Sequence, residues 1–225
     1  MATRIRRKSN SIIKGILFDL DGTLLDTREL ILASFHYTIQ TVLGYDKPDE
    51  VLLAKVGQPL NVQMRDYAAT AERAEEMCAI YRAHNLSIHD DMVKSFEGIK
   101  EMLDILKKRG YRMGVVTSKK NSTALRGLRV TGLDGYFEKV MGYDDCVFHK
   151  PDPRCVIEGC KSMGLIPEEC VYVGDSPFDM HAGMGAGCIC IGVLWGMFSE
   201  KRLIEEKPDH IVGHPKEIIE ILDLY

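Results

Sequence analysis

Asp19 and Asp21 stand two positions apart, directly after the short apolar run 15–18. A short apolar run of this kind is typical of a buried strand in a parallel sheet, and open α/β sheets bind ligands at the carboxyl ends of their strands. Two carboxylates held close together raise each other's pKa unless a cation lies between them. The pair therefore indicates a divalent metal, a reactive carboxylate, or both.

Other polar groups follow later apolar runs. They comprise two hydroxyl residues, a lysine on a loop with nearby prolines, and two more carboxylates: Thr117, Ser118, Lys150, Asp175 and Asp179. Because parallel strands end at one edge of a sheet, we expect Thr117, Lys150 and Asp175 to converge with the acidic pair. Oxygen ligands suit Mg²⁺, while lysine and helix N-terminal amides suit a phosphoryl group. The set predicts phosphoryl chemistry.

The elements that must position these groups are short apolar runs separated by helical patterns. Five runs are predicted strands: 15–19, 112–117, 139–142, 170–174 and 188–193. Alternation of strands and helices indicates a doubly wound, mostly parallel sheet. We therefore predict an α/β fold with a five-stranded sheet.

Residues 28–92 interrupt this alternation, because they show helical patterns without a convincing strand. Asp26 with Glu29 fits a capping box that would open the first helix. We expect residues 12–27 and 93–225 to form the α/β catalytic core and residues 28–92 to form a helical cap beside the acidic loop. Residues 1–11 are expected to be a disordered N-terminal extension.

Composition excludes several classes of protein. A net charge of −4 over 225 residues argues against a nucleic-acid partner. The chain has no apolar run of the roughly 20 residues that span a bilayer, so no membrane partner is expected. Seven cysteines, an odd number, are interpreted as reduced and mostly buried, which favours the cytoplasm. Nothing in the pattern decides between a monomer and a dimer.

The chain resembles the haloacid dehalogenase-like hydrolase superfamily, through four motifs in order. The motifs are residues 19–27, 115–117, 150–153 and 174–183. Any one of them is modest support, but four in order over most of the chain make chance a poor explanation. The resemblance implies an α/β core with a small helical cap inserted between the first two motifs.

The resemblance implies separate roles for the acidic pair. Asp19 would be the nucleophile that forms an aspartyl-phosphate. Asp21 would protonate the leaving group and then activate water. An acid at this second position fits phosphate ester or anhydride cleavage, because the dehalogenases of the family lack it.

The same resemblance implies a Mg²⁺ site and a phosphate site. The metal ligands would be Asp19, the backbone carbonyl of Asp21, and Asp175, with Asp179 behind them. Phosphoryl oxygens would be bound by three residues: Thr117, the amide of Ser118, and Lys150. Asp19, Asp21, Thr117 and Lys150 would form the catalytic set.

Softer features resemble the phosphoglycolate phosphatases and related pyrophosphatases within the family. These features are residues 57–60 in the cap, His149 before the lysine, and residues 193–196 after the last predicted strand. Gln58 and Arg65 are candidates for substrate contacts from the cap. Arg65 is equally well explained as a surface charge.

The leading hypothesis is a Mg²⁺-dependent phosphatase that acts on a small phosphorylated metabolite such as phosphoglycolate. Alternatives are an inorganic pyrophosphatase and a sugar phosphomutase similar to β-phosphoglucomutase. A non-catalytic binding protein on the same fold is a further alternative, but the intact motif residues argue against it.

Overall fold

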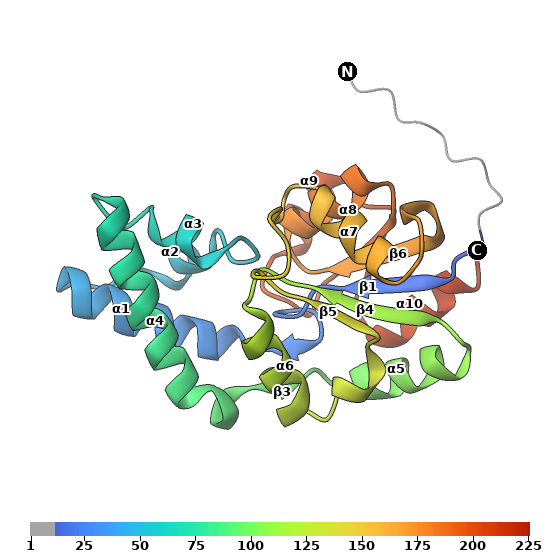
Figure 1. Ribbon diagram of the computed structural model, residues 1–225, viewed down its shortest axis with the longest axis horizontal. Helices are drawn as coiled ribbons and strands as arrows, with labels where there is room; N and C mark the ends of the chain where they lie inside the picture. Colours follow the sequence, from blue (N-terminus) through green and yellow to red (C-terminus); the bar gives the residue numbers. More distant parts are fainter. Residues whose placement is uncertain (1–11) are drawn as a thin grey trace, which may run out of the picture.

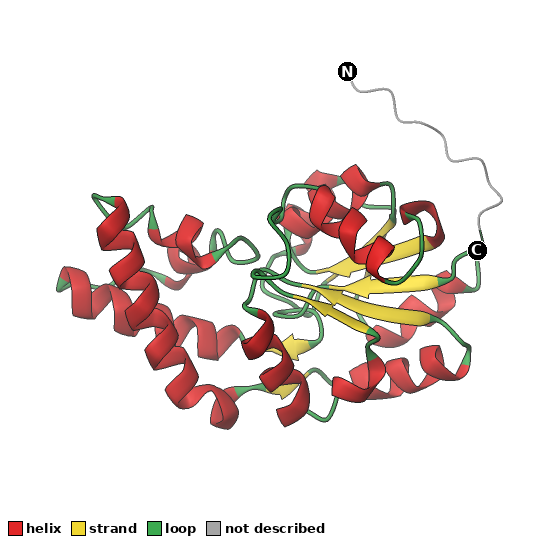
Figure 2. Cartoon of the chain, in the orientation of Figure 1, coloured by secondary structure: helices red, strands yellow, loops and turns green. Residues whose placement is uncertain are grey.

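The computed structural model describes residues 12–225, so the predicted N-terminal extension lies outside the described residues. At its centre is a parallel sheet of six strands in the order β5-β4-β1-β6-β7-β8 (Figure 2). The strands are β1 Gly15–Phe18, β4 Arg112–Val116, β5 Lys139–Met141, β6 Cys170–Gly174, β7 Ile189–Val193 and β8 His210–Val212. The predicted α/β class and parallel sheet are confirmed.

The sheet has one strand more than the predicted five. The additional strand, β8, pairs with β7 at one edge and is three residues long. Three residues give no readable alternation of polar and apolar side chains, and Pro208 and Gly213 beside them indicate loops. The prediction of five strands was therefore wrong by this one edge strand.

The first strand lies in the middle of the sheet, paired in parallel with β4 on one side and β6 on the other. From β1 the chain builds outward through β4 and β5, then crosses back and builds through β6, β7 and β8. A crevice opens at the carboxyl end of a sheet where the strand order reverses in this way. The end of β1 is therefore the expected ligand position.

Helices cover both faces of the sheet (Figure 1). One face is covered by α5 Ile99–Lys108, α6 Asn121–Val130 and α10 Pro215–Leu222, and the other by α7 Arg154–Ser162, α8 Pro177–Ala186 and α9 Glu200–Glu206. Two 3₁₀ helices, Asp134–Tyr136 and Pro167–Glu169, lie in the connections. Ile16 and Phe18 pack on the first face and Leu17 on the second, so burial on both faces explains the continuous apolar run of β1.

Residues 28–92, the helical insertion, form a separate group of helices to the left of the sheet in Figure 1. They are α1 Arg28–Leu43, α2 Asp49–Leu53, α3 Leu60–Met64 and α4 Ala71–Met92. Their apolar side chains form a hydrophobic cluster of their own, which includes Phe35, Ile39, Met64 and Met77. The chain enters the insertion through β2 Leu25–Asp26 and leaves it through β3 Lys94–Ser95, and these two strands pair with each other in antiparallel fashion.

The predicted capping box of Asp26 and Glu29 is absent at the start of α1. The residue that precedes the helix is Thr27, and no side chain caps the helix there. Asp26 is instead the last residue of β2. Pairing with β3 thus holds Asp26 in a strand, and the helix begins one residue later than predicted.

Within residues 12–225, every helix is too short or too polar to cross a lipid bilayer.

Candidate active site

Asp19 follows directly after β1, and its backbone N–H donates a hydrogen bond to the carbonyl of Val173 on β6 (2.8 Å). The chain then turns sharply at Gly22, where φ is +86°. A Cβ atom at Gly22 would lie 2.3 Å from Oδ2 of Asp175. Both the left-handed backbone and this close approach require glycine, so the turn brings the loop after β1 against the loop after β6.

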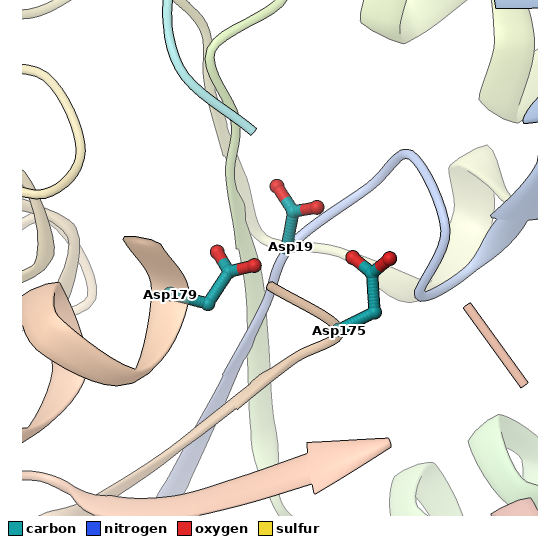
Figure 3. A group of neighbouring side chains, drawn as sticks. All are labelled: Asp19, Asp175 and Asp179. Atoms are coloured by element: carbon teal, nitrogen blue, oxygen red, sulfur yellow. The ribbon is translucent and has the colours of Figure 1, made fainter. Parts of the chain in front are cut away.

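Three carboxylates meet at this point: Asp19, Asp175 at the end of β6, and Asp179 in the first turn of α8. One oxygen from each lies within 4.8 Å of the others. Figure 3 shows the three side chains, which come from separate segments, gathered around one centre. Their exposed fractions are 3%, 2% and 0%. The sequence predicted that Asp19 and Asp175 would converge, and the resemblance placed Asp179 behind them; the structure brings all three together.

Burial and mutual repulsion make this cluster unfavourable without a cation. Burial raises the pKa of Asp19 to about 7, against the attraction of Lys150, and Asp179 adds to the rise. Burial is the main cause that raises the pKa of Asp175 well above its ordinary value, and the negative charges of Asp179 and Asp19 add to the rise. Hard carboxylate oxygens at this spacing fit a divalent metal ion, whose charge would offset the repulsion.

Lys150 contacts two of the three carboxylates. Its Nζ forms ion pairs with Asp19 and, at 2.7 Å, with Oδ1 of Asp179. Although burial alone would lower the pKa of Lys150, the charges of Asp179 and Asp19 raise it above its ordinary value. The lysine therefore stays charged and fixes the position of both acids.

Asp179 is bound by protein groups at both oxygens. Besides Lys150, Oδ1 accepts a hydrogen bond from the buried hydroxyl of Tyr172 (3.2 Å). Oδ2 accepts from the amide of Ser176 (3.0 Å) and from its hydroxyl (2.5 Å), an arrangement that caps α8. These partners leave Asp179 little capacity for a further ligand, so its position suits a supporting role.

Asp175 is held from the loop after β7. The amide of Met197 donates to its Oδ2 (2.7 Å), and a Cβ at Gly196 would lie 2.2 Å from its Cβ. The side chain of Met197 packs against the hydrophobic cluster of the helical insertion. One residue thus contacts both the acidic cluster and the insertion, a contact that sequence reasoning missed.

Asp21 points to different partners. Its Oδ1 accepts hydrogen bonds from Nζ of Lys119 (2.6 Å) and from the hydroxyl of Thr27 (2.8 Å). The Asp21 carboxylate does not belong to the group of three acids that the described residues form. Lys119 was missed in the sequence, although it follows Thr117 by two positions in a loop already expected at the site.

Thr117 and Ser118 lie at the end of β4, beside the cluster. Thr117 is 7% exposed, and its Oγ1 accepts a hydrogen bond from the amide of Lys119 (3.2 Å). The Ser118 hydroxyl donates to the carbonyl of Gly57 in the insertion (2.6 Å). Ser118 therefore joins core and insertion through its side chain, and its backbone amide is the group that could bind phosphate.

A cavity of about 440 Å³ opens above Asp19 and Asp21, with walls from the core and the insertion. Thr117, Ser118, Lys150 and Gln58, all predicted site residues, line it. Arg65, the other candidate from the cap, is exposed at the end of α3 and is not among the lining residues, which agrees with the alternative of a surface charge. Other lining residues were not singled out in the sequence: Asn61, Gln63, Tyr81, Arg82, Asn85, Lys119, Lys120 and Arg126.

Two amide oxygens in the wall from α3 are buried without a hydrogen-bond partner within residues 12–225. They are Oδ1 of Asn61 and Oε1 of Gln63. Gln63 is 7% exposed, and its Nε2 already donates to the carbonyl of Gln58 (2.8 Å), which fixes the direction of the amide. Buried acceptors normally have a partner, so this wall is built to contact water or a polar ligand.

The fold and this site define the class of protein. Residues 16–193 match the model of the haloacid dehalogenase-like hydrolase family, and the chain belongs to that family. Among solved structures it is similar to a predicted phosphoglycolate phosphatase from Haemophilus somnus 129PT, with 26% identity, a TM-score of 0.85, and coverage of 93% of this chain and 97% of that one. A predicted phosphatase from Clostridium acetobutylicum gives 26% identity, a TM-score of 0.86, and coverage of 95% and 100%.

Two relatives with higher sequence identity are both named pyrophosphatases. A chain from Clostridium perfringens, provisionally named pyrophosphatase PpaX, is 40% identical over 212 residues, which are 94% of this chain and 98% of that one. The pyrophosphatase PpaX of Bacillus velezensis is 37% identical over 209 residues, or 93% and 96% of the two chains. The family, the hydrolase class and the phosphatase-like fold are thereby confirmed.

Proposed function

We propose that this protein is a Mg²⁺-dependent phosphatase that hydrolyses a small phosphorylated metabolite through an aspartyl-phosphate on Asp19. The observation that carries the proposal is the position of Asp19. Asp19 lines the cavity, and its carboxylate lies within 4.8 Å of Asp175 and Asp179 oxygens and is paired with Lys150. A nucleophile, a cation and a candidate metal site therefore share one small volume.

In the first step, an Asp19 oxygen attacks phosphorus and the bond from phosphorus to the leaving oxygen breaks. Protonated Asp21 gives its proton to that oxygen. In the second step, Asp21 takes a proton from water, the water oxygen attacks phosphorus, and the bond between phosphorus and Asp19 breaks. Phosphate leaves and both acids return to their starting states. The pairing of Asp21 with Lys119 and Thr27 fixes the direction of its carboxylate for both transfers.

Asp19, Asp175 and the backbone carbonyl of Asp21 would hold Mg²⁺, with Asp179 supporting them. When bound, the ion supplies positive charge to the phosphoryl oxygens and to the acidic cluster. The buried, mutually repelling carboxylates fit such an ion.

The phosphoryl group would lie between Thr117, the amide of Ser118 and Lys150, which all line the cavity. Charge stabilisation and positioning account for most of phosphoryl-transfer catalysis. The helical insertion would act as a cap, because it supplies the opposite wall and is joined to the core by the hydrogen bond from Ser118 to Gly57. Gln58 is the proposed cap contact that lines the cavity.

Phosphoglycolate is the leading substrate, and inorganic pyrophosphate is the second candidate, favoured by the names of the relatives. A reaction on a small metabolite fits the cytoplasm as the compartment. The buried Cys160 and Cys188 agree with a reducing environment, since their sulfur atoms lie 3.9 Å apart and form no disulfide bond.

The test is phosphate release from phosphoglycolate, pyrophosphate and a hexose 1-phosphate, with Mg²⁺ and with a chelator. We expect Mg²⁺-dependent release from at least one of the first two, and none from the Asp19→Asn protein. Equal release by the wild type and Asp19→Asn would refute the nucleophile. Isomerisation of the hexose phosphate without stoichiometric phosphate release would identify a mutase instead.

A further inference from the structure

The cations around the cavity differ in whether a protein carboxylate already neutralises them. Lys150 is paired with Asp19 and Asp179, and Lys119 with Asp21 at 2.6 Å. A third cation, Arg126, is paired with Asp90 on α4 at 2.8 Å. Two lining cations remain without a carboxylate partner among the described residues: Arg82 on α4 and Lys120 before α6.

These two cations are not equivalent. Lys120 is exposed, so water screens its charge. Arg82 is half-buried in the wall that the insertion forms, where screening is weaker. A guanidinium also presents a planar fork that binds a carboxylate or phosphate through two hydrogen bonds, which an ammonium group does not. Arg82 is therefore the better placed of the two to recognise an anion.

The wall around Arg82 has other features of a binding site. The buried oxygens of Asn61 and Gln63, on the neighbouring helix α3, line the same cavity and lack partners within residues 12–225. Apolar side chains from the insertion, including Ile31, Phe35 and Leu60, complete the lining. A few polar groups in a mostly apolar concave wall are typical of a ligand site, and the oxygens can bind the water that hydrates a small anion.

We propose that Arg82 is a specificity-determining residue that binds a second anionic group of the substrate, separate from the phosphoryl group held near Asp19. This inference rests on the proposed phosphatase function and adds the substrate class: small phosphorylated compounds with a further oxyanion. That oxyanion is a carboxylate in phosphoglycolate and a second phosphate in pyrophosphate. Arg82 lies in the insertion, so the core performs the chemistry and the insertion selects the anion.

The experiment compares kcat/KM for phosphoglycolate, pyrophosphate and ethyl phosphate, in which a methyl group replaces the carboxylate of phosphoglycolate. The preference is the ratio of kcat/KM for phosphoglycolate or pyrophosphate to kcat/KM for ethyl phosphate. In Arg82→Gln we expect this ratio to fall about 10- to 100-fold, which corresponds to the loss of one charge-assisted hydrogen bond. The substrate whose preference falls identifies the oxyanion. Arg82→Lys should recover only part of the preference, because it keeps the charge but loses the fork.

Two control variants each remove one positive charge, as Arg82→Gln does, but at another position. Arg65→Gln, in the insertion but outside the cavity, should leave all three values unchanged. Lys120→Gln should lower the values in a salt-dependent way and most for the most highly charged substrate, as expected for the loss of general electrostatic attraction. At high salt this effect should disappear, whereas the effect of Arg82→Gln should persist. An unchanged preference in Arg82→Gln, or an equal loss for all three substrates, would overturn the proposal.

Binding measured by calorimetry separates this proposal from the proposed function. The Asp19→Asn protein should bind phosphoglycolate or pyrophosphate more tightly than ethyl phosphate, and adding Arg82→Gln should remove the difference. If wild type hydrolyses none of the three compounds, the phosphatase function fails, whereas the binding preference still decides the role of Arg82. Far-UV circular dichroism checks that each variant is folded.

Discussion

Replacing Lys150 with methionine tests the electrostatics of the acidic cluster. The Lys150 side chain is 1% exposed and lies between the buried carboxylates of Asp19 and Asp179. Removing one partner of a buried ion pair leaves a buried charge uncompensated and costs about 3–5 kcal/mol. For a chain of this size that corresponds to a fall in Tm of about 6–20 °C.

The loss should depend on pH, and its sign follows from Asp19. In the wild-type fold the pKa of Asp19 is already raised to about 7 from 3.8, and removing Lys150 raises it further. A folded state with a raised carboxyl pKa takes up a proton as the pH falls, so it regains stability at low pH and loses it as the pH rises through that pKa. Destabilisation by Lys150→Met should therefore be greater near pH 8 than near pH 5, by about 1.4 kcal/mol for the pH unit above the wild-type pKa of Asp19.

The assay is urea and thermal unfolding of the metal-free proteins at both pH values. Lys161→Met is the matched control, because Lys161 forms an exposed ion pair with Glu158 at 2.8 Å. Exposed pairs contribute about 0–1 kcal/mol, so this control should change little at either pH. Equal losses in the two variants, or a loss in Lys150→Met that does not vary with pH, would refute the reasoning.

Three further predictions concern the same site. Asp19→Asn should reduce phosphate release to the background rate. Asp21→Asn should retain phosphoryl transfer only for good leaving groups such as 4-nitrophenol, which need no proton from a general acid. Comparison of 4-nitrophenyl phosphate with an alkyl phosphate checks this. Gly22→Ala should lose both stability and activity, because the new Cβ would lie 2.3 Å from Oδ2 of Asp175. Gly44 is also at positive φ but has open space around it, so Gly44→Ala should show only the backbone penalty of about 1 kcal/mol in unfolding experiments. Adding Mg²⁺ should raise the Tm of the wild type more at pH 8 than at pH 5, because the pKa of Asp19 is raised to about 7 and the ion binds the ionised carboxylate.

The parts of the fold that the sequence predicted depend on local signals. The apolar runs of β1, β4 and β6 identified the central strands, and the polar residues after them identified the site, because strand order guarantees that those ends meet. The edge strand β8 was missed because three residues have no periodicity. The residue that precedes α1 was misassigned because Asp26 lies in β2. There Asp26 pairs with Lys94 of β3, which is 68 positions away in the chain.

Contacts between distant segments could not be read in this way. Lys119 binds Asp21 from 98 positions away, and no local pattern marks that pair. Two arginines of the insertion show the same limit. The five-residue helix α3 is too short to show which side faces the core, so the sequence left Arg65 open between a substrate contact and a surface charge. It did not single out Arg82 on α4, which lines the cavity.

The pairing of β2 with β3 also bears on how such a protein can change over evolutionary time. Leu25 lies opposite Ser95 and Asp26 opposite Lys94, so the two ends of the helical insertion meet side by side. A segment whose ends are adjacent can be lengthened, shortened or exchanged without altering the register of the sheet. With the proposed division between a reactive core and a selective insertion, new substrates can be acquired by rebuilding the insertion while the core is kept.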